Sequence, residues 1–378
     1  MSAAVDADRL TAVLRERRLD ALVAASPENV QYSAGVALVT QRLIPERLAF
    51  AIWKPSGPAT ALVEALEEEV TRRRGAIADV RTYDEHADGP ITALAGLLRE
   101  GGIDGGRIGI EARFMTHDAT ARMAAALPRA TLVPADEIFD ALRLRKSKAE
   151  QERLERAARL LEDTIAMAAS VARPGMSERS LGVQMLTELT NRSEGRLSGL
   201  AATVASGPNA HVTHHGMAER GLQDGDLVRL GCRGVYEGYH GIVMRTGVIG
   251  PPSAALRRIQ RDLHEIHVAV IEALRPGTVA QAVYGEALRQ YAKRGYTLPL
   301  PHVGHSVGLG LQERPKFHGG ATEVLVADMV CVVVNVIASE HGRFYLEDMI
   351  AIDESGPRSL SCAEATADLL NVGGVPRP

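Results

Sequence analysis

Apolar residues in the first 140 positions alternate between helical spacing and short continuous runs. Residues 9–19 (RLTAVLRERRL) carry apolar side chains at helical spacing, and Ala21–Ala25 forms a short continuous run typical of a buried strand. Two further strand-like stretches follow at 47–52 and 59–66, and a glycine-rich segment leads into another strand by Ile110. Strands that alternate with helices predict an α/β domain.

The pattern changes at residues 146–170, KSKAEQERLERAARLLEDTIAMAAS. This stretch is rich in strong helix formers, and its apolar positions recur at helical spacing. We therefore place a domain boundary just before it. The predicted domains are residues 1–145 and residues 146–378.

Two segments of the second domain resemble each other. VARPGMSERSLGVQMLTEL (171–189) and EALRPGTVAQAVYGEALRQ (272–290) each predict a helix that ends at an Arg-Pro-Gly turn, followed by a second helix. The turns begin at residues 173 and 275. This duplication indicates two similar halves around one site, although a chance match of a common turn tripeptide is the alternative.

The rest of the second domain is rich in strands. Residues 227–250 predict tightly turned strands with several glycines, and Met329–Ile337 is a continuous apolar run. The last clear strand, Phe344–Ile352, is interrupted by Glu347 and Asp348. A carboxylate inside an apolar strand needs a partner or a function, because burying it alone is costly.

Composition narrows the functional classes. The chain has 378 residues, 46% of them hydrophobic and 24% charged, with a net charge of −4. No long block of like charge is present, which argues against nucleic acid or anionic membranes as main partners. The three cysteines, Cys232, Cys331 and Cys362, are widely spaced and predict reduced thiols in a cytoplasmic protein. We expect neither a signal peptide nor a membrane span.

Histidines mark the candidate chemistry. His302 and His305 lie in PHVGHSVGLGLQERP (301–315), and HVTHH places His211, His214 and His215 together. A buried imidazole is either a hydrogen-bonded core residue or part of a site. A histidine in a turn-rich segment is alternatively a solvated loop residue. The clustered histidines also leave open a metal site of a new kind, since imidazole binds zinc, copper or nickel.

The order of these segments resembles the creatinase and aminopeptidase P (prolidase) family. LDALVAASPENVQYSAG is similar to the start of the family's N-terminal domain, and LRLRKSKAEQERLERAA is similar to its domain junction. HVTHH, GYHGIVMRT, GHSVGLGLQERP and YLEDMIAI follow in the family's order. The resemblance implies an α/β N-terminal domain followed by an α+β pita-bread C-terminal domain.

The resemblance also identifies where the family's metal ligands fall. Most members are peptidases that hold two divalent ions with two Asp, one His and two Glu. The histidine matches His305 and the last glutamate matches Glu347, but the other three positions hold Gly231, Ile242 and Val334. An ion pair needs several carboxylates to bridge it and to neutralise its charge. We therefore predict no metal ligands and no cofactor.

His214 matches the general acid/base of creatinase, a metal-free member of the family. The resemblance thus predicts a metal-independent, creatinase-like enzyme that hydrolyses or cleaves a C–N bond of a small polar substrate. A neutral imidazole can exchange protons near pH 7. Glu347 would orient a histidine or hold a cationic group; a buried ion pair with Arg245 is the alternative. The predicted catalytic residues are His214, His305 and Glu347, and the predicted substrate-binding residues are His211, Tyr239, His240, His302, Glu313 and Asn335.

Two alternative functions stay open at this point. One is a non-catalytic pita-bread module that binds a peptide or a partner protein. The other is a divergent Xaa-Pro dipeptidase with a remodelled metal site. The resemblance further implies a homodimer, because relatives are commonly dimers in which one subunit's N-terminal domain leans over the other's site.

Overall fold

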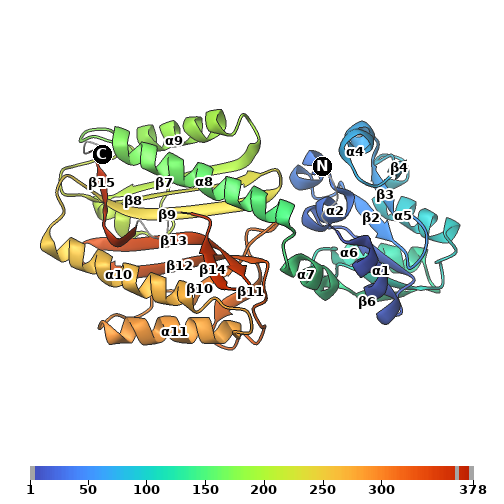
Figure 1. The fold of residues 1–378 in the computed structure, drawn as a ribbon. Helices are drawn as coiled ribbons and strands as arrows, with labels where there is room; N and C mark the ends of the chain where they lie inside the picture. Colours follow the sequence, from blue (N-terminus) through green and yellow to red (C-terminus); the bar gives the residue numbers. More distant parts are fainter. Residues whose placement is uncertain (1–4, 362–365, 374–378) are drawn as a thin grey trace. The chain divides into compact units, whose positions relative to one another are not determined.

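The computed structural model describes residues 5–361 and 366–373, so Cys362 lies outside the described part. The chain divides into two compact units, Met1–Arg143 and Leu144–Pro378 (Figure 1). Cys232 and Cys331 are buried free thiols. Within the described ranges, no helix has the length and apolar character needed to cross a bilayer.

The N-terminal unit contains a six-stranded sheet in the order β4-β3-β2-β1-β5-β6. β1 pairs in parallel with β5, and β5 with β6, whereas β2 is antiparallel to both of its neighbours. The predicted α/β class is confirmed. The strands are β1 (Ala21–Ala24), β2 (Phe50–Trp53), β3 (Thr60–Glu64), β4 (Asp79–Tyr83), β5 (Arg107–Ile110) and β6 (Thr131–Pro134).

Helices of this unit bury apolar residues against the sheet. Leu94, Ala95 and Leu98 of one helix join strand residues such as Val23 and Ile108 in a single core. The helices are α1 (Ala7–Glu16), α2 (Pro27–Ala34), α3 (Val39–Leu43), α4 (Glu68–Arg74), α5 (Gly89–Glu100), α6 (His117–Ala126) and α7 (Asp136–Leu144), with a 3₁₀ turn at Ala65–Glu67.

The C-terminal unit contains a nine-stranded sheet in which β11-β10-β12-β13-β9-β8-β7 form the main path. β14 pairs with β13, and β15 pairs with β9. The predicted strand-rich segments are confirmed. The strands are β7 (Leu197–Ser206), β8 (Leu227–Tyr236), β9 (Tyr239–Ile249), β10 (His302–Ser306), β11 (Glu313–His318), β12 (Met329–Ser339), β13 (Gly342–Asp353), β14 (Gly356–Ser359) and β15 (Leu370–Val372).

Two helix pairs pack along this sheet, one along each half (Figure 1). Each pair has an Arg-Pro-Gly turn between its helices, as the duplicated segments predict. Ser147 and Glu150 form a capping box that starts the first helix. The helices are α8 (Lys148–Val171), α9 (Glu178–Arg192), α10 (Ala254–Glu272) and α11 (Ala280–Lys293).

Both pairs cover the same face of the sheet. Cys232 and Val243 pack with α8 and α9, while Val333 and Leu346 pack with α10 and α11. Successive residues of a strand point to opposite faces. The other face, which we call the inner face, therefore carries the residues between these: Arg229, Gly231, Ile242, Met244, Thr246, Val332, Val334, Val336, Tyr345 and Glu347.

Candidate active site

One cross-strand row of the inner face contains three of the positions that match the family's metal ligands. Gly231 pairs with Met244, Met244 with Glu347, and Glu347 with Val334. Residues that are directly opposite in an antiparallel sheet point to the same face. His305 joins from β10, because it pairs with Val332, two residues before Val334. The row spans five strands, β8, β9, β13, β12 and β10, and it brings Glu347 and His305 to one surface.

Glu347 is a buried carboxyl group in apolar surroundings. Val334, Val336 and Tyr345 form a buried cluster beside it, and Met244 and Leu300 pack against that cluster. Within the described residues, its carboxylate makes no hydrogen bond or ion pair. Burial and the negative charge of Asp348 together raise the pKa of Glu347 to about 7, against the opposing effect of Arg245. A carboxyl with this pKa can accept or donate a proton near neutral pH.

His305 presents one defined nitrogen to the site. Its Nδ1 lies 3.0 Å from the carbonyl oxygen of Ser306. A carbonyl only accepts hydrogen bonds, so Nδ1 carries the proton and Nε2 keeps its lone pair. Burial lowers the pKa of His305 to about 4, so the ring is neutral at pH 7. The His302 ring packs edge-on against it, with the centroids 6.0 Å apart.

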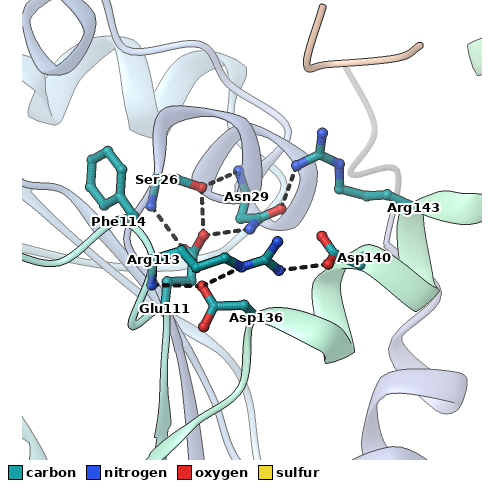
Figure 2. A pocket seen from close by; sticks show the side chains of 8 residues that line it. All are labelled: Ser26, Asn29, Glu111, Arg113, Phe114, Asp136, Asp140 and Arg143. Atoms are coloured by element: carbon teal, nitrogen blue, oxygen red, sulfur yellow. Dashed lines mark hydrogen bonds and ion pairs between the residues drawn. The ribbon is translucent and has the colours of Figure 1, made fainter. Parts of the chain in front are cut away.

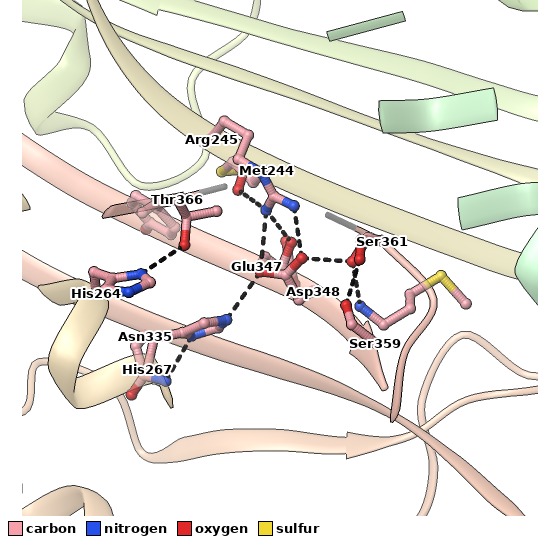
Figure 3. Close-up of polar contacts among 12 residues, drawn as sticks. Met244, Arg245, His264, His267, Asn335, Glu347, Asp348, Ser359, Ser361 and Thr366 are labelled. Carbon is pink, nitrogen blue, oxygen red and sulfur yellow. Dashed lines mark hydrogen bonds and ion pairs between the residues drawn. The ribbon is translucent and has the colours of Figure 1, made fainter. Parts of the chain in front are cut away.

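Asp348, the residue after Glu347, lies in a different environment on the helix-covered face (Figure 3). Arg245 Nη2 donates to Asp348 Oδ1 at 2.6 Å, and His267 Nε2 lies 2.9 Å from Asp348 Oδ2. Arg245 also pairs with Glu162 of α8. The arginine holds the pKa of Asp348 well below its usual range despite burial. Arg245 therefore pairs with Asp348, and it reaches only the backbone carbonyl of Glu347.

The segment that carries His214 lies at the surface. His211 and His214 are both exposed, whereas His215 is partly buried and lies 3.1 Å from the carboxylate of Glu178. The backbone of the segment is held from the inner face, because Arg229 donates to the carbonyls of Val212 and Thr213. His214 thus belongs to a segment attached to the inner face, and its catalytic role stays a prediction.

Two predicted substrate-binding residues point away from the inner face. Tyr239 is buried against α8, and its hydroxyl donates to Glu150 at 3.1 Å. Asn335 pairs with Leu346 and contacts His267 Nδ1 at 3.0 Å (Figure 3). The strand alternation that brings Glu347 inward turns both of these side chains outward. Both side chains therefore lie on the helix-covered face, away from Glu347, and their role in substrate binding stays a prediction.

Glu313 and His240 have structural contacts. Glu313 accepts from the buried Lys146 at 3.0 Å and from the Gly310 backbone at 2.9 Å. This ion pair fastens β11 to the start of α8. The backbone of His240 donates to the Gly308 carbonyl at 2.8 Å. By strand alternation the His240 side chain is on the same side of β9 as Met244.

The N-terminal unit has a polar cavity of about 180 Å³, lined by residues that are already paired (Figure 2). Glu111 accepts from the backbone of Ser26 at 2.8 Å and from Asn29 Nδ2 at 2.5 Å. Arg113 donates to Asp140 at 2.5 Å, and Arg143 donates to Asn29 at 2.8 Å. These bonds fix the start of α2 and leave little capacity for a ligand.

Sequence reasoning missed Arg229 and Tyr345 of the inner face. Both side chains are buried, and both carry polar atoms without a hydrogen-bond partner. The available signal for Arg229 was a single charged residue inside the apolar run LVRLGC. Tyr345 gave no signal, because an aromatic residue is common in a buried strand.

Comparison with known families resolves the chain's relationships. Residues 152–354, over half of the chain, match metallopeptidase family M24, and residues 7–145 match the creatinase/prolidase N-terminal domain. The chain belongs to the M24 family. The predicted pita-bread fold and the resemblance to creatinase, aminopeptidase P and prolidase are confirmed.

Individual relatives are peptidases by name. The chain is 29% identical over 280 residues to an uncharacterized peptidase of Bacillus subtilis, covering 73% of this chain and 78% of the relative. It is 25% identical over 233 residues to an Xaa-Pro dipeptidase of Pyrococcus furiosus, covering 61% and 66%. A dipeptidase structure from Pyrococcus horikoshii superimposes with a TM-score of 0.83 at 26% identity, over 95% of this chain and 98% of that one.

These relatives correct the main functional prediction. A metal-independent, creatinase-like enzyme is not what the matching proteins indicate, since they are named as peptidases and Xaa-Pro dipeptidases. The prediction was wrong because it gave more weight to the missing ligands than to the rest of the chain. The alternative of a divergent dipeptidase agrees better with the comparisons.

The residues of this chain do not fit the family's pair of metal ions. All five ligand positions lie on the inner face, but only His305 and Glu347 can bind a cation there. Gly231, Ile242 and Val334 offer no donor atom, and Val334 is packed against Val336 and Tyr345. Within residues 5–361 and 366–373, no three His, Cys, Asp or Glu side chains form a metal-binding group. The inner face has kept the family's geometry and replaced its ligands.

Proposed function

We propose that this protein is a divergent dipeptidase that hydrolyses the amide bond of a short peptide at the inner face of the nine-stranded sheet. Its family membership and its dipeptidase relatives support the reaction class. The feature that carries the proposal is Glu347, a buried carboxyl without a partner among the described residues, whose pKa is raised to about 7 by burial and by the charge of Asp348. Shifted titratable groups in water-poor sites are typical of catalytic centres.

Glu347 would transfer the proton. In its ionised form it can take a proton from an attacking water, and it can return that proton to the leaving amine. Proton transfer of this kind contributes a factor of about 10²–10⁴ to the rate. The apolar neighbours Val334 and Val336 keep water away and hold this pKa near neutrality.

His305 would orient the reacting groups. Its neutral ring directs the Nε2 lone pair toward the inner face, where it can accept a hydrogen bond from water or from the substrate amine. His214 lies on a segment fixed to the same face by Arg229 and is a second candidate for proton transfer. A homodimer and a cytoplasmic location stay predictions.

The test is a hydrolysis assay on the full-length protein. Xaa-Pro dipeptides and matched dipeptides without proline are incubated with the protein, both as purified and after addition of manganese, cobalt or zinc. We expect release of the C-terminal amino acid, and a loss of at least about 100-fold in kcat in Glu347→Gln. Glu340→Gln is the matched control, because Glu340 is exposed in the turn just before β13.

Three results would contradict the proposal. The first is the absence of turnover with every peptide and ion. The second is an unchanged kcat in Glu347→Gln. The third is tight peptide binding without any hydrolysis, which would favour the non-catalytic binding module instead.

A further inference from the structure

Arg229 is a fully buried arginine that lacks a carboxylate partner. Its Nη2 donates to the carbonyls of Val212 at 2.7 Å and Thr213 at 3.1 Å. Its Nε and Nη1 have no hydrogen-bond partner in the part of the chain that the structure describes, and the residue is 0% exposed. Among the described residues, no aspartate or glutamate forms an ion pair with it. Three N–H bonds of a charged group are thus left over inside the protein.

Tyr345 lies beside this guanidinium with a second unused polar group. The Arg229 Cζ atom is 4.8 Å from the centroid of the Tyr345 ring. The hydroxyl of Tyr345 is buried and also has no hydrogen-bond partner among residues 5–361 and 366–373. Arg229 pairs with Thr246 across the sheet, and Thr246 bonds to the backbone of Tyr345. The unused donors of both residues therefore lie on the inner face.

Two charged side chains, Arg343 and Glu178, act on Arg229 through space. Burial lowers the pKa of Arg229 and the charge of Arg343 lowers it further, whereas Tyr345 and Glu178 oppose this shift. Glu178 acts on Arg229 only through space, since its oxygens accept hydrogen bonds from Ser206, Asn209 and Ala218 and contact His215. An arginine stays protonated even when buried. A buried unpaired cation costs several kcal/mol unless an anion or water completes its hydrogen bonds.

We propose that Arg229 and the Tyr345 hydroxyl form an anion subsite that receives the free carboxylate of the substrate. Arginine binds carboxylates with two parallel hydrogen bonds, and the phenol can add a third. This inference rests on the proposed dipeptidase function, because a dipeptide has a free C-terminal carboxylate. The inner face would thus lack three of the family's metal-binding carboxylates and would instead bind the carboxylate of the substrate through Arg229.

The proposed subsite lies next to Glu347 on the inner face. Tyr345 is two residues from Glu347 along β13, a separation of about 7 Å. In a dipeptide, the amide and the terminal carboxylate are about one residue step, 3.8 Å, apart. With its carboxylate on Arg229, the peptide would extend along the inner face toward Glu347. Tyr345, Val334 and Glu347 are each 6–8% exposed, so the face is not completely sealed at this point.

The test measures binding in the Glu347→Gln background, where substrate is not consumed. Calorimetry compares Gly-Pro with Gly-Pro amide, and free proline with prolinamide. We expect the carboxylate form to bind at least about 30-fold more tightly than the amide. This ratio should approach 1 in Arg229→Gln and persist in Arg233→Gln, because Arg233 is an exposed residue of the same strand and face.

Two further variants guard against a folding defect. Arg229→Lys keeps the charge and should retain part of the preference. Tyr345→Phe removes only the hydroxyl and should reduce the preference by about 3–10-fold. Inorganic phosphate and acetate are titrated separately to detect a site for free anions.

The binding measurements can overturn the proposed anion subsite in three ways. Equal affinity for carboxylate and amide would overturn the inference, even if dipeptides are hydrolysed. A preference that survives in both Arg229→Gln and Tyr345→Phe would also overturn it. Phosphate that binds more tightly than every carboxylate would overturn the assignment to substrate. An Arg229-dependent preference without hydrolysis would support the subsite and contradict only the proposed function.

Discussion

Glu347 and Asp348 are adjacent carboxylates of one strand with opposite surroundings. Asp348 faces the helices and is saturated by Arg245, His267 and Ser361 (Figure 3). Glu347 faces the inner side and has apolar neighbours and no partner within the described residues. Burial acts on both, yet the pKa of Asp348 is lowered and that of Glu347 is raised. The difference arises because Arg245, His267 and Ser361 all contact the carboxylate of Asp348, and none of them contacts that of Glu347.

The comparison separates structural from functional buried charges. Glu111 in the N-terminal unit repeats the pattern of Asp348, because Ala25, Ser26 and Asn29 all donate to it (Figure 2). A buried carboxylate that is fully hydrogen-bonded holds structure together. Glu347 and Arg229 depart from this rule on the same face, and a group without partners is available to a ligand.

The largest expected effect on stability comes from removing the charge of Asp348, which pairs with Arg245. Asp348→Asn leaves Arg245 buried with an incomplete set of charges, and we expect a loss of about 3–5 kcal/mol in the free energy of unfolding. Urea denaturation measures this loss. Asp353→Asn, on the same strand but in an exposed pair with Arg358, should cost less than about 1 kcal/mol. Equal effects of the two substitutions would contradict the comparison.

Substitution of Glu347, on the inner face, should increase the free energy of unfolding at high pH. Because the folded pKa of Glu347 is about 7 and its ordinary value is 4.5, the folded state keeps a proton that the unfolded chain releases between these values. The associated stability is complete below pH 4.5 and is lost as the pH rises through 7. Glu347→Gln removes this dependence.

We therefore expect Glu347→Gln to match the wild type in unfolding free energy at pH 4. At pH 8 it should exceed the wild type by up to about 3 kcal/mol. Denaturation curves across this pH range test the expectation. A variant that is less stable than the wild type at pH 8 would show that Glu347 has a partner after all.

A second carboxylate beside Glu347 should make the stability of the inner face depend more strongly on pH. Val334→Glu places a carboxyl directly opposite Glu347. At pH 8 we expect a loss of about 1–3 kcal/mol from packing and like-charge repulsion, and part of it should return at pH 5. Val334→Gln separates volume from charge. Added manganese should restore stability to the Glu variant and not to the Gln variant, and equal recovery in both would contradict this reading.

The smallest effect is expected at Tyr239. Tyr239→Phe removes one hydrogen bond to Glu150 on the helix-covered face, which should cost about 1 kcal/mol in unfolding free energy. Its kcat and KM for dipeptides should stay at wild-type values. A raised KM would show that Tyr239 takes part in substrate binding.

The sequence by itself determined the two-domain class and the duplicated helix pairs, and the resemblance to the family identified His305 and Glu347 as candidate site residues. Hydrophobic periodicity and local turn signals carry this information, because each depends on residues close in the chain. The resemblance to the family also identified Gly231, Ile242 and Val334 as positions without ligands. Weighing those losses alone led to the wrong functional prediction.

Only the tertiary structure decided which side chains share a face. Tyr239 and Asn335 stand next to inner-face residues in the sequence, but strand alternation turns them toward the helices. Arg245 pairs with Asp348 and not with Glu347 for the same reason, because its side chain lies on the helix-covered face. Arg229 and Tyr345 are 116 positions apart (345 − 229), and the sheet brings them into contact through Thr246. Partnership between buried charges is set by cross-strand register, and register depends on the whole sheet.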